Sequence, residues 1–180
     1  KENTNLRNRF CFITPEGEQY NYDKKHLFSF AGEDELFSAG NKNIIINYKG
    51  INIKPQICYD LRFPVWSKNN YNKEKDIFDY DVLIYVANWP ERRILNWHQL
   101  LIARAIENQC YVIGVNRVGL ENEKINYSGK SMIVHPSGKV LFEAPDNQEI
   151  VKTITLDFEE LKEFRKRFPF ASDWDKFTIK

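Results

Sequence analysis

The stretch that decides the fold is residues 81–116, which read DVLIYVANWPERRILNWHQLLIARAIENQCYVIGVN. Asp81–Ala87 is a nearly continuous apolar run, which is typical of a strand covered on both faces. Glu91–Asn108 predicts a helix, and Cys110–Val115 predicts a second buried strand. One stripe of the helix carries Ile94, Trp97, Leu101 and Ala105. Strands that flank a helix in this way indicate a layered α/β or α+β domain.

Upstream of this unit, an apolar hairpin leads to a cysteine. Residues 43–48 and 51–57 are predicted to pair around Lys49-Gly50, and the alternation within 51–57 predicts a half-buried strand. Cys58 follows directly, and the chain continues as YDLRFP over residues 59–64, where the proline can begin a helix. A thiol at a sharp turn after a strand is held rigidly and can be reached, which suits a nucleophile. The same position also fits a buried structural cysteine, since free cysteine is often buried.

The rest of the chain predicts further short elements. Additional strands are expected at residues 9–14, 19–22, 131–135, 139–143 and 149–156. A final helix near Phe158–Phe168 leads into an aromatic tail, and Asn69–Asp79 is polar enough to be a surface excursion.

Composition narrows the class of protein. The 180 residues suffice for one domain with a real core, and 42% of them are hydrophobic. The net charge of +1 gives no indication of a nucleic-acid surface. Cys11, Cys58 and Cys110 form neither a paired zinc pattern nor a disulfide framework, which favours a reducing, cytoplasmic location. We see no signal peptide and no apolar run long enough to cross a membrane.

Three groups that precede or directly follow Cys58 could assist a thiol nucleophile. Attack on an amide or nitrile requires a proton acceptor, a group that stabilises the oxyanion, and a proton donor for the leaving amine. Lys24 and Glu33 lie on the polar loop before the hairpin, and the backbone N–H of Tyr59 follows the thiol. A lysine beside the thiol would lower its pKa and place a cationic donor near the oxyanion.

Several blocks of sequence together resemble the nitrilase superfamily of carbon–nitrogen hydrolases. They are residues 22–28, 32–35 with Ala39-Gly40, 57–64, 87–90, 103–108 and 114–119. They occur in the family's order over nearly the whole chain, and they look most like those of bacterial omega-amidases. The resemblance implies an α+β fold, a four-layer αββα sandwich, in which residues 1–180 form the C-terminal two-thirds of a single carbon–nitrogen hydrolase domain.

The resemblance also implies a catalytic role for each matching residue. Cys58 would be the nucleophile and Lys24 the lysine of the triad, because Lys24 lies two residues after Tyr22. Glu33 matches the family's second glutamate, which helps to position the substrate or the lysine. The N–H of Tyr59 would form the other half of the oxyanion hole.

The implied reaction is hydrolysis of a small 2-oxo acid monoamide, 2-oxoglutaramate or 2-oxosuccinamate, through a cysteine thioester and without metal or cofactor. Arg62 and Trp89 match positions near the pocket and could contact a substrate carboxylate or form a wall. A small-molecule amide is the expected partner, with no nucleic acid and no membrane, and the family commonly forms homodimers or larger homo-oligomers.

One part of the family's pattern has no match. The first glutamate of the family, its general base, lies on a strand well upstream of the lysine, and Glu2, Glu16 and Glu18 do not match its motif. We therefore expect an N-terminal portion of the domain to be missing, and the isolated chain to be inactive or poorly folded. The alternatives are another amidase, a nitrilase or a carbamoylase on the same fold, or an inactive binding or scaffold fragment.

Other polar residues and cysteines near these motifs have plainer explanations. His26 could act as the base of a Cys–His hydrolase, but a hydrogen bond that anchors its loop is favoured. Asn116 ends a strand, where it could form a turn or support the site. Cys11 and Cys110 lie within predicted strands and are expected to pack in the core.

Overall fold

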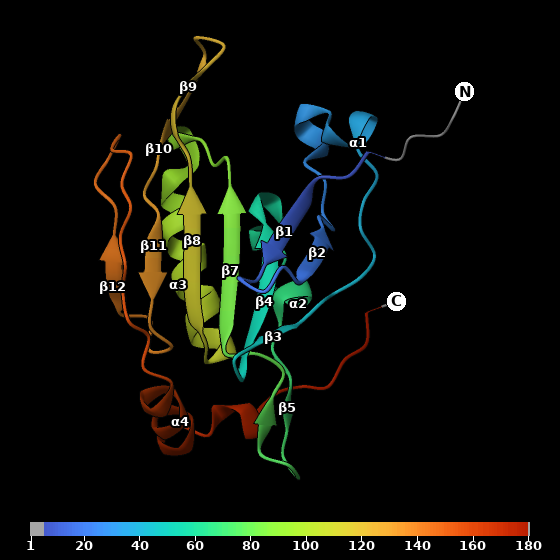
Figure 1. Ribbon diagram of the computed structural model, residues 1–180, viewed down its shortest axis with the longest axis vertical. Coiled ribbons are helices and arrows are strands. Elements are labelled where there is room, and N and C mark those ends of the chain that lie inside the picture. The colour runs from blue at the N-terminus through green and yellow to red at the C-terminus, as the bar shows by residue number, and fades with distance from the viewer. Residues whose placement is uncertain (1–5, 180) are drawn as a thin grey trace.

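The computed structural model describes residues 6–179, and its centre is a six-stranded mixed sheet with the order β12-β11-β8-β7-β4-β3 (Figure 1). The strands are β3 (Ile46–Tyr48), β4 (Ile51–Ile57), β7 (Val82–Ala87), β8 (Tyr111–Asn116), β11 (Met132–Val134) and β12 (Val140–Glu143). The neighbours β4, β7 and β8 run parallel, and the other pairs are antiparallel. The mixed α+β class is therefore confirmed.

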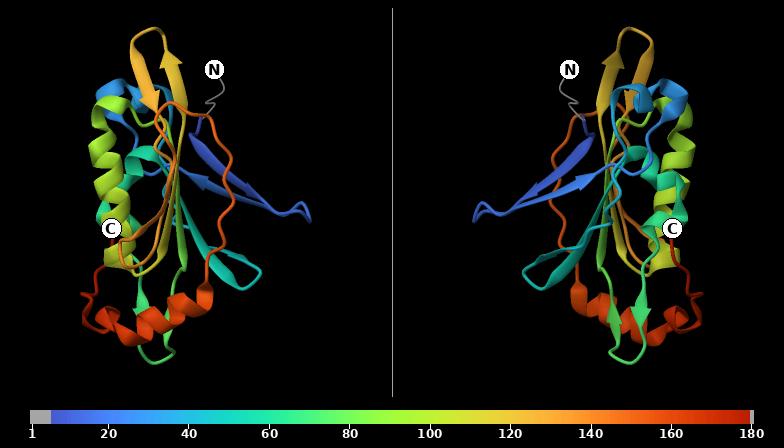
Figure 2. Two further views of the ribbon diagram at one scale, coloured as in Figure 1. Left: turned by 90° about the vertical axis from the view of Figure 1, so that its left-hand side faces the viewer. Right: turned by 90° about the vertical axis from the view of Figure 1, so that its right-hand side faces the viewer.

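One face of the sheet is closely covered by helix α3 (Ile94–Asn108) (Figure 2). The predicted helix over residues 91–108 is present, with its first turn formed as the 3₁₀ helix η3 (Glu91–Arg93). Trp97, Leu101 and Ala105 are fully buried against side chains of β7, β8 and β11. Gly114 of β8 allows this contact, because a Cβ atom there would lie 2.5 Å from Leu101 Cδ1.

The opposite face of the sheet is more open. Figure 2 shows α3 on one side of the sheet and, on the other, the β1–β2 hairpin and the segment that leads to α4 (Phe158–Arg167). Leu161 of α4 is buried against Val82 and Tyr111, but Val115 remains 48% exposed. Residues 6–179 therefore provide one helical layer, the main sheet and only part of the cover expected on its second face.

Small two-stranded sheets and short helices surround the main sheet. The paired strands are β1 (Arg9–Ile13) with β2 (Gln19–Asp23), β5 (Tyr71–Asn72) with β6 (Ile77–Phe78), and β9 (Val118–Glu121) with β10 (Ile125–Ser128). The short helices are η1 (Ser29–Ala31), α1 (Glu33–Leu36), η2 (Cys58–Arg62), α2 (Pro64–Ser67) and η4 (Phe170–Asp173). Within residues 6–179, none of the helices is long and apolar enough to span a membrane.

Three local predictions were wrong. Residues 149–156 form no strand, because no strand within residues 6–179 pairs with them and Val151 is 97% exposed. The strand β4 is not half-buried throughout: Lys54 and Gln56 are buried because they share a face with Leu83 and Tyr85 beneath the helical layer.

The third wrong prediction concerns a cysteine. Cys11 is exposed on β1, because this strand belongs to a two-stranded sheet and not to the main sheet. Cys110, directly before β8, is fully buried as expected.

Candidate active site

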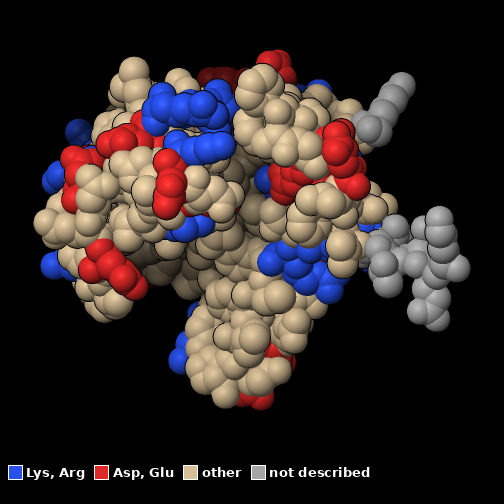
Figure 3. Space-filling model, turned by 90° about the horizontal axis from the view of Figure 1, so that it is seen from above, with Lys and Arg blue, Asp and Glu red and all other residues tan. Residues whose placement is uncertain are grey.

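The candidate site lies at the edge of the sheet where the three parallel strands end. Cys58 follows β4, Asn88 follows β7, and Asn116 is the last residue of β8. The carboxyl ends of neighbouring parallel strands meet at one edge, which is where ligands bind in open α/β sheets. Seen from above this end in Figure 3, the surface is hollowed between groups of charged side chains.

The backbone at Cys58 turns sharply. Its φ of 44° lies in the left-handed region, which costs a residue with a side chain about 1–3 kcal/mol. The turn starts helix η2 and directs the half-buried thiol toward the loop after β7, where Sγ lies 3.9 Å from the carbonyl oxygen of Asn88. A strained turn of this kind persists only where surrounding contacts hold it.

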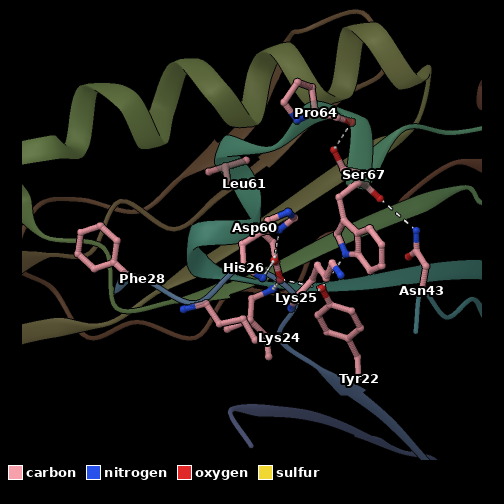
Figure 4. A network of polar contacts seen from close by, with 12 residues as sticks. Tyr22, Lys24, Lys25, His26, Phe28, Asn43, Asp60, Leu61, Pro64 and Ser67 are labelled. Carbon is pink, nitrogen blue, oxygen red and sulfur yellow. Dashed lines mark hydrogen bonds and ion pairs between the residues drawn. The ribbon is translucent and has the colours of Figure 1, made fainter. Parts of the chain in front are cut away.

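A buried carboxylate beneath the turn provides those contacts (Figure 4). Asp60 is fully buried and accepts hydrogen bonds from the Tyr22 hydroxyl at 2.8 Å, the His26 N–H at 2.9 Å and the Ile57 N–H at 3.1 Å. Tyr22 in turn accepts a hydrogen bond from Trp66 Nε1 at 2.9 Å. Burial, and then the charge of Asp60, raise the pKa of Tyr22 far above its usual value, so Tyr22 remains a neutral donor.

His26 joins the same network with its side chain. Its Nδ1 lies 2.8 Å from Asp60 Oδ1, and its ring stacks on Phe63 at a centroid distance of 3.8 Å. The loop-anchoring contact predicted for His26 is therefore confirmed. Because His26 and Tyr22 flank Lys24 in the sequence, these contacts fix the segment that carries Lys24, which lines the same cavity as Cys58.

Lys24 and Glu33 form a nearly buried ion pair. Lys24 is only 3% exposed, and its Nζ lies 2.6 Å from Glu33 Oε2. The Phe28 N–H also donates to Glu33, at 2.6 Å, and Asn8 Nδ2 donates at 2.8 Å. Burial alone would raise the pKa of Glu33, but these hydrogen bonds and the Lys24 charge outweigh it and lower the pKa. Glu33 is therefore ionised and a weak base.

The surroundings of the Cys58 thiol shift its pKa in the opposite direction, upward. Burial raises the pKa of Cys58, and the charges of Glu33 and Asp60 act in the same direction. The charge of Lys24 lowers that pKa but does not offset burial. Cys58 is therefore a thiol at neutral pH, and a base has to remove its proton when it attacks.

Two cavities meet at Cys58. The larger, about 730 Å³ and open to solvent, is lined by Cys58 together with Lys24 and Glu33. The smaller, about 40 Å³, is also lined by Cys58. Its remaining walls are Phe28, Tyr59, Arg62, Asn88, Trp89, Pro90 and Arg93. The structure thus places Lys24 and Glu33 in one cavity beside the thiol, and Tyr59, Arg62 and Trp89 in the other.

Asn116 supports the wall of the smaller cavity. Its Oδ1 accepts a hydrogen bond from the Trp89 N–H at 2.7 Å, and its Nδ2 donates to the Trp89 and Gly129 carbonyl oxygens at 3.0 and 2.7 Å. Of the two roles considered for Asn116, the structure shows support of the site.

Sequence reasoning gave no role to Asp60, Arg93 or Arg104. Arg104 on α3 is buried, and it donates to the Leu61 carbonyl oxygen at 2.6 Å, which ties the Cys58 turn to the helix. An arginine among the apolar residues of α3 was the available signal for this contact. Arg93 had a weaker signal, its position shortly after the Trp-Pro break at the end of β7.

Neither Glu16 nor Glu18 lines either cavity at Cys58. Glu16 and Glu18 lie at the exposed tip of the β1–β2 hairpin, which projects away from the sheet in Figure 2, and Glu2 lies outside the described residues. Within residues 6–179, no group of three or more His, Cys, Asp or Glu side chains is placed to hold a metal ion.

The chain belongs to the carbon–nitrogen hydrolase family, whose family model matches residues 1–166. Omega-amidase YafV of Escherichia coli strain K12 is 44% identical over 172 residues, and 2-oxoglutaramate amidase of Bacillus subtilis is 35% identical over 174 residues. Each match covers 96% of this chain and 64% of the relative, so the chain spans about 64% of their length.

A solved structure has the same fold. The protein XC1258 from Xanthomonas campestris is a CN-hydrolase superfamily protein with an arsenic adduct in its active site. It superposes with a TM-score of 0.95 at 40% identity, covering 100% of this chain and 68% of that chain. The nitrilase-type fold inferred from the sequence is therefore confirmed.

Proposed function

We propose that the protein hydrolyses the side-chain amide of a small 2-oxo dicarboxylic acid monoamide, with Cys58 as the nucleophile. The observation that carries this proposal is the placement of the Cys58 thiol, the Lys24 ammonium and the Glu33 carboxylate on the walls of one cavity. The names of two relatives, an omega-amidase and a 2-oxoglutaramate amidase, support the choice of substrate.

In the first step, Cys58 Sγ bonds to the amide carbonyl carbon, and the carbonyl oxygen becomes an oxyanion. Lys24 and the N–H of Tyr59 stabilise this oxygen. The N–H of Tyr59 belongs to the first turn of η2, where N–H groups have no partner within the helix. Donors positioned in advance in this way favour the transition state over the bound amide.

Glu33 acts in this scheme as a positioning residue and not as the base. Its carboxylate is held by Lys24, the Phe28 N–H and Asn8, and its lowered pKa makes it a poor acceptor for the thiol proton. Its role is to fix the Lys24 ammonium toward the cavity. The proton of Cys58 goes instead to the glutamate that the family resemblance expects upstream of Lys24.

The remaining steps follow from the proton balance. The base passes the thiol proton to the amide nitrogen, the C–N bond breaks and ammonia leaves, which produces a thioester on Cys58. Water then attacks the thioester carbonyl, the base accepts a proton from the water, and the thiol is restored as the dicarboxylate product departs. The larger cavity is open to solvent and gives both water and ammonia a path.

The test is ammonia release from 2-oxoglutaramate by the intact protein. The Cys58→Ala variant should lose turnover by about 10³-fold or more, as expected for removal of a nucleophile. Cys11→Ala is the matched control, because Cys11 is exposed on the separate β1–β2 sheet. Retained turnover in Cys58→Ala, with its folded spectrum and oligomeric state unchanged, would overturn the assignment.

The alternative substrates are separated by a direct comparison of rates. We expect 2-oxoglutaramate to be hydrolysed faster than a simple aliphatic nitrile or an N-carbamoyl amino acid. The arginines of the smaller cavity favour a substrate with a carboxylate. A protein that hydrolyses none of these substrates would support the binding or scaffold alternative.

A further inference from the structure

We propose that Arg93, together with Arg62, forms an anion subsite beside Cys58 that selects amides carrying a carboxylate, and that Arg93 is a specificity-determining residue. This inference rests on the proposed amidase function for the identity of the substrate, but the subsite itself is argued from the geometry around the thiol.

Aromatic rings hold both guanidinium groups at the smaller cavity. The Arg62 guanidinium lies 5.0 Å from the ring centroid of Trp89, and that of Arg93 lies 5.2 Å from the ring centroid of Phe28. A guanidinium held on a ring in this way can still present its N–H donors in a fixed fork to a carboxylate. Both side chains line the cavity that contains Cys58.

Neither cation is neutralised by the protein. Within residues 6–179, no carboxylate lies at ion-pair distance from Arg62 or Arg93, and Arg62 Nη2 donates only to the neutral amide of Asn96, at 3.2 Å. The other arginine near the thiol, Arg117 in the larger cavity, is paired with Glu121 at 3.5 Å. The cations of the smaller cavity are therefore the ones that remain free for an external anion.

The two guanidinium groups also repel each other. Burial lowers the pKa of Arg93, and the charges of Arg92 and Arg62 lower it further. A bound carboxylate would relieve this repulsion and accept hydrogen bonds from both side chains. The site therefore favours an anion over a neutral group.

The size of the cavity limits what the subsite accepts. One water molecule needs about 10–15 Å³ of cavity volume. The smaller cavity, about 40 Å³, therefore has room for a group of two or three heavy atoms, such as a carboxylate. A short substrate would place its carboxylate between the two arginines and its amide carbonyl at Cys58. Ammonia would then leave toward the larger cavity.

Alkylation of Cys58 tests the subsite without requiring amidase activity. Iodoacetate and iodoacetamide react in the same way: the thiolate sulfur bonds to the CH₂ carbon and iodide leaves. They differ in that iodoacetate carries a carboxylate where iodoacetamide carries a neutral amide. The rate of Cys58 modification by each reagent would be measured by peptide mass spectrometry at about pH 8.5, where a thiol of raised pKa is partly ionised.

The variants to compare are Arg93→Gln and the matched control Arg92→Gln. Arg92 is adjacent in the sequence but exposed, and it does not line the cavity. In Arg93→Gln the iodoacetate rate should fall about tenfold or more, while the iodoacetamide rate should change less than about twofold. Arg92→Gln should leave the ratio of the two rates within about twofold of the wild-type ratio.

Each outcome decides the proposal. Equal losses in the two variants would show a general field of positive charge and would overturn the subsite, as would an unchanged ratio in Arg93→Gln. A fall in the iodoacetamide rate equal to the fall in the iodoacetate rate would show that Arg93 acts on the thiol itself, through its charge or through the Cys58 turn, and would also overturn the subsite. If the ratio depends on Arg93 but the intact protein releases no ammonia from 2-oxoglutaramate, the subsite stands and the amidase proposal fails.

Discussion

The Cys58 turn separates two regions whose charged groups are partnered differently: the buried side around Asp60, below the turn, and the cavity side around the thiol, above it. Below the turn, Asp60 is fully buried, and Tyr22, His26 and Ile57 all donate to it. Above the turn, the thiol faces cavities where Arg62 and Arg93 lack a carboxylate partner within residues 6–179. Buried polar groups are costly unless they are paired, whereas unpaired charges in a cavity remain available to a ligand. Substitutions below the turn should therefore change stability, and substitutions above it should change reactivity.

The largest effect on stability is expected from Asp60→Ala. Its removal leaves buried donors of Tyr22, His26 and Ile57 without an acceptor, which should lower the free energy of unfolding by about 3–5 kcal/mol. Urea unfolding measures this change. Asp34→Ala, at an exposed position of α1, should stay within about 0.5 kcal/mol of the wild type. Similar losses in both variants would remove the distinction between the two sides of the turn.

Tyr22→Phe should have a smaller effect on the same side. The Trp66 indole N–H loses its acceptor and Asp60 loses one donor, which should cost about 2 kcal/mol of unfolding free energy. Tyr20→Phe is a matched control on the same strand, because the Tyr20 hydroxyl donates to the exposed Glu18, at 3.2 Å. Equal unfolding midpoints for Tyr22→Phe and the wild type would contradict a structural role for the buried network.

Lys24→Met should act on reactivity. Because the charge of Lys24 lowers the pKa of Cys58, its removal should raise that pKa further, and the midpoint of Cys58 alkylation should shift to higher pH. At a fixed pH below the midpoint, the iodoacetamide rate should fall by up to about tenfold, since one pKa unit changes the thiolate fraction about tenfold. Lys25→Met, which removes a charge placed over the Trp66 ring, serves as the control. A pH profile that moves equally in both variants would refute the specific role of Lys24.

The smallest expected effect is the pH dependence carried by Glu33. Its pKa is lower in the folded state than its ordinary value of 4.5, so its contribution to stability is present above that value and is lost as the pH falls through the folded-state pKa. Glu33→Gln should therefore lose less stability than the wild type on acidification below about pH 4.5, because the variant has no carboxylate to protonate at this position. Glu35→Gln, exposed on the same helix, should retain the wild-type dependence. Parallel pH curves for the wild type and Glu33→Gln would contradict the proposed role of the ion pair.

The sequence predicted the residues around Cys58 better than the contacts that hold them. The ordered motifs identify the strands β4, β7 and β8, and the geometry of parallel strands then brings the residues that follow them to one edge. The hairpin turn was readable because Lys49-Gly50 stands between two apolar runs, and in the structure both residues have the positive φ that a two-residue type I′ turn requires. Local pattern and strand geometry suffice for such features.

The remaining features depend on contacts between distant segments. Asp60 finds Tyr22 and His26 more than thirty residues away, which no local pattern indicates. Cys11 is exposed because β1 pairs with β2 outside the main sheet, although its local sequence is that of a core strand. Arg93 reaches the cavity from a 3₁₀ turn ahead of α3, and a helix pattern alone does not predict where that side chain lies.

The most direct test is to trap the acyl group during turnover. The intact protein would be mixed with 2-oxoglutaramate and quenched in acid, and the peptides that contain Cys11, Cys58 and Cys110 would be weighed by mass spectrometry. We expect the acyl mass on the Cys58 peptide alone, and no ammonia release in Cys58→Ala. Release of ammonia at the wild-type rate by Cys58→Ala, or an acyl group on another cysteine, would contradict the assignment of Cys58 as the nucleophile.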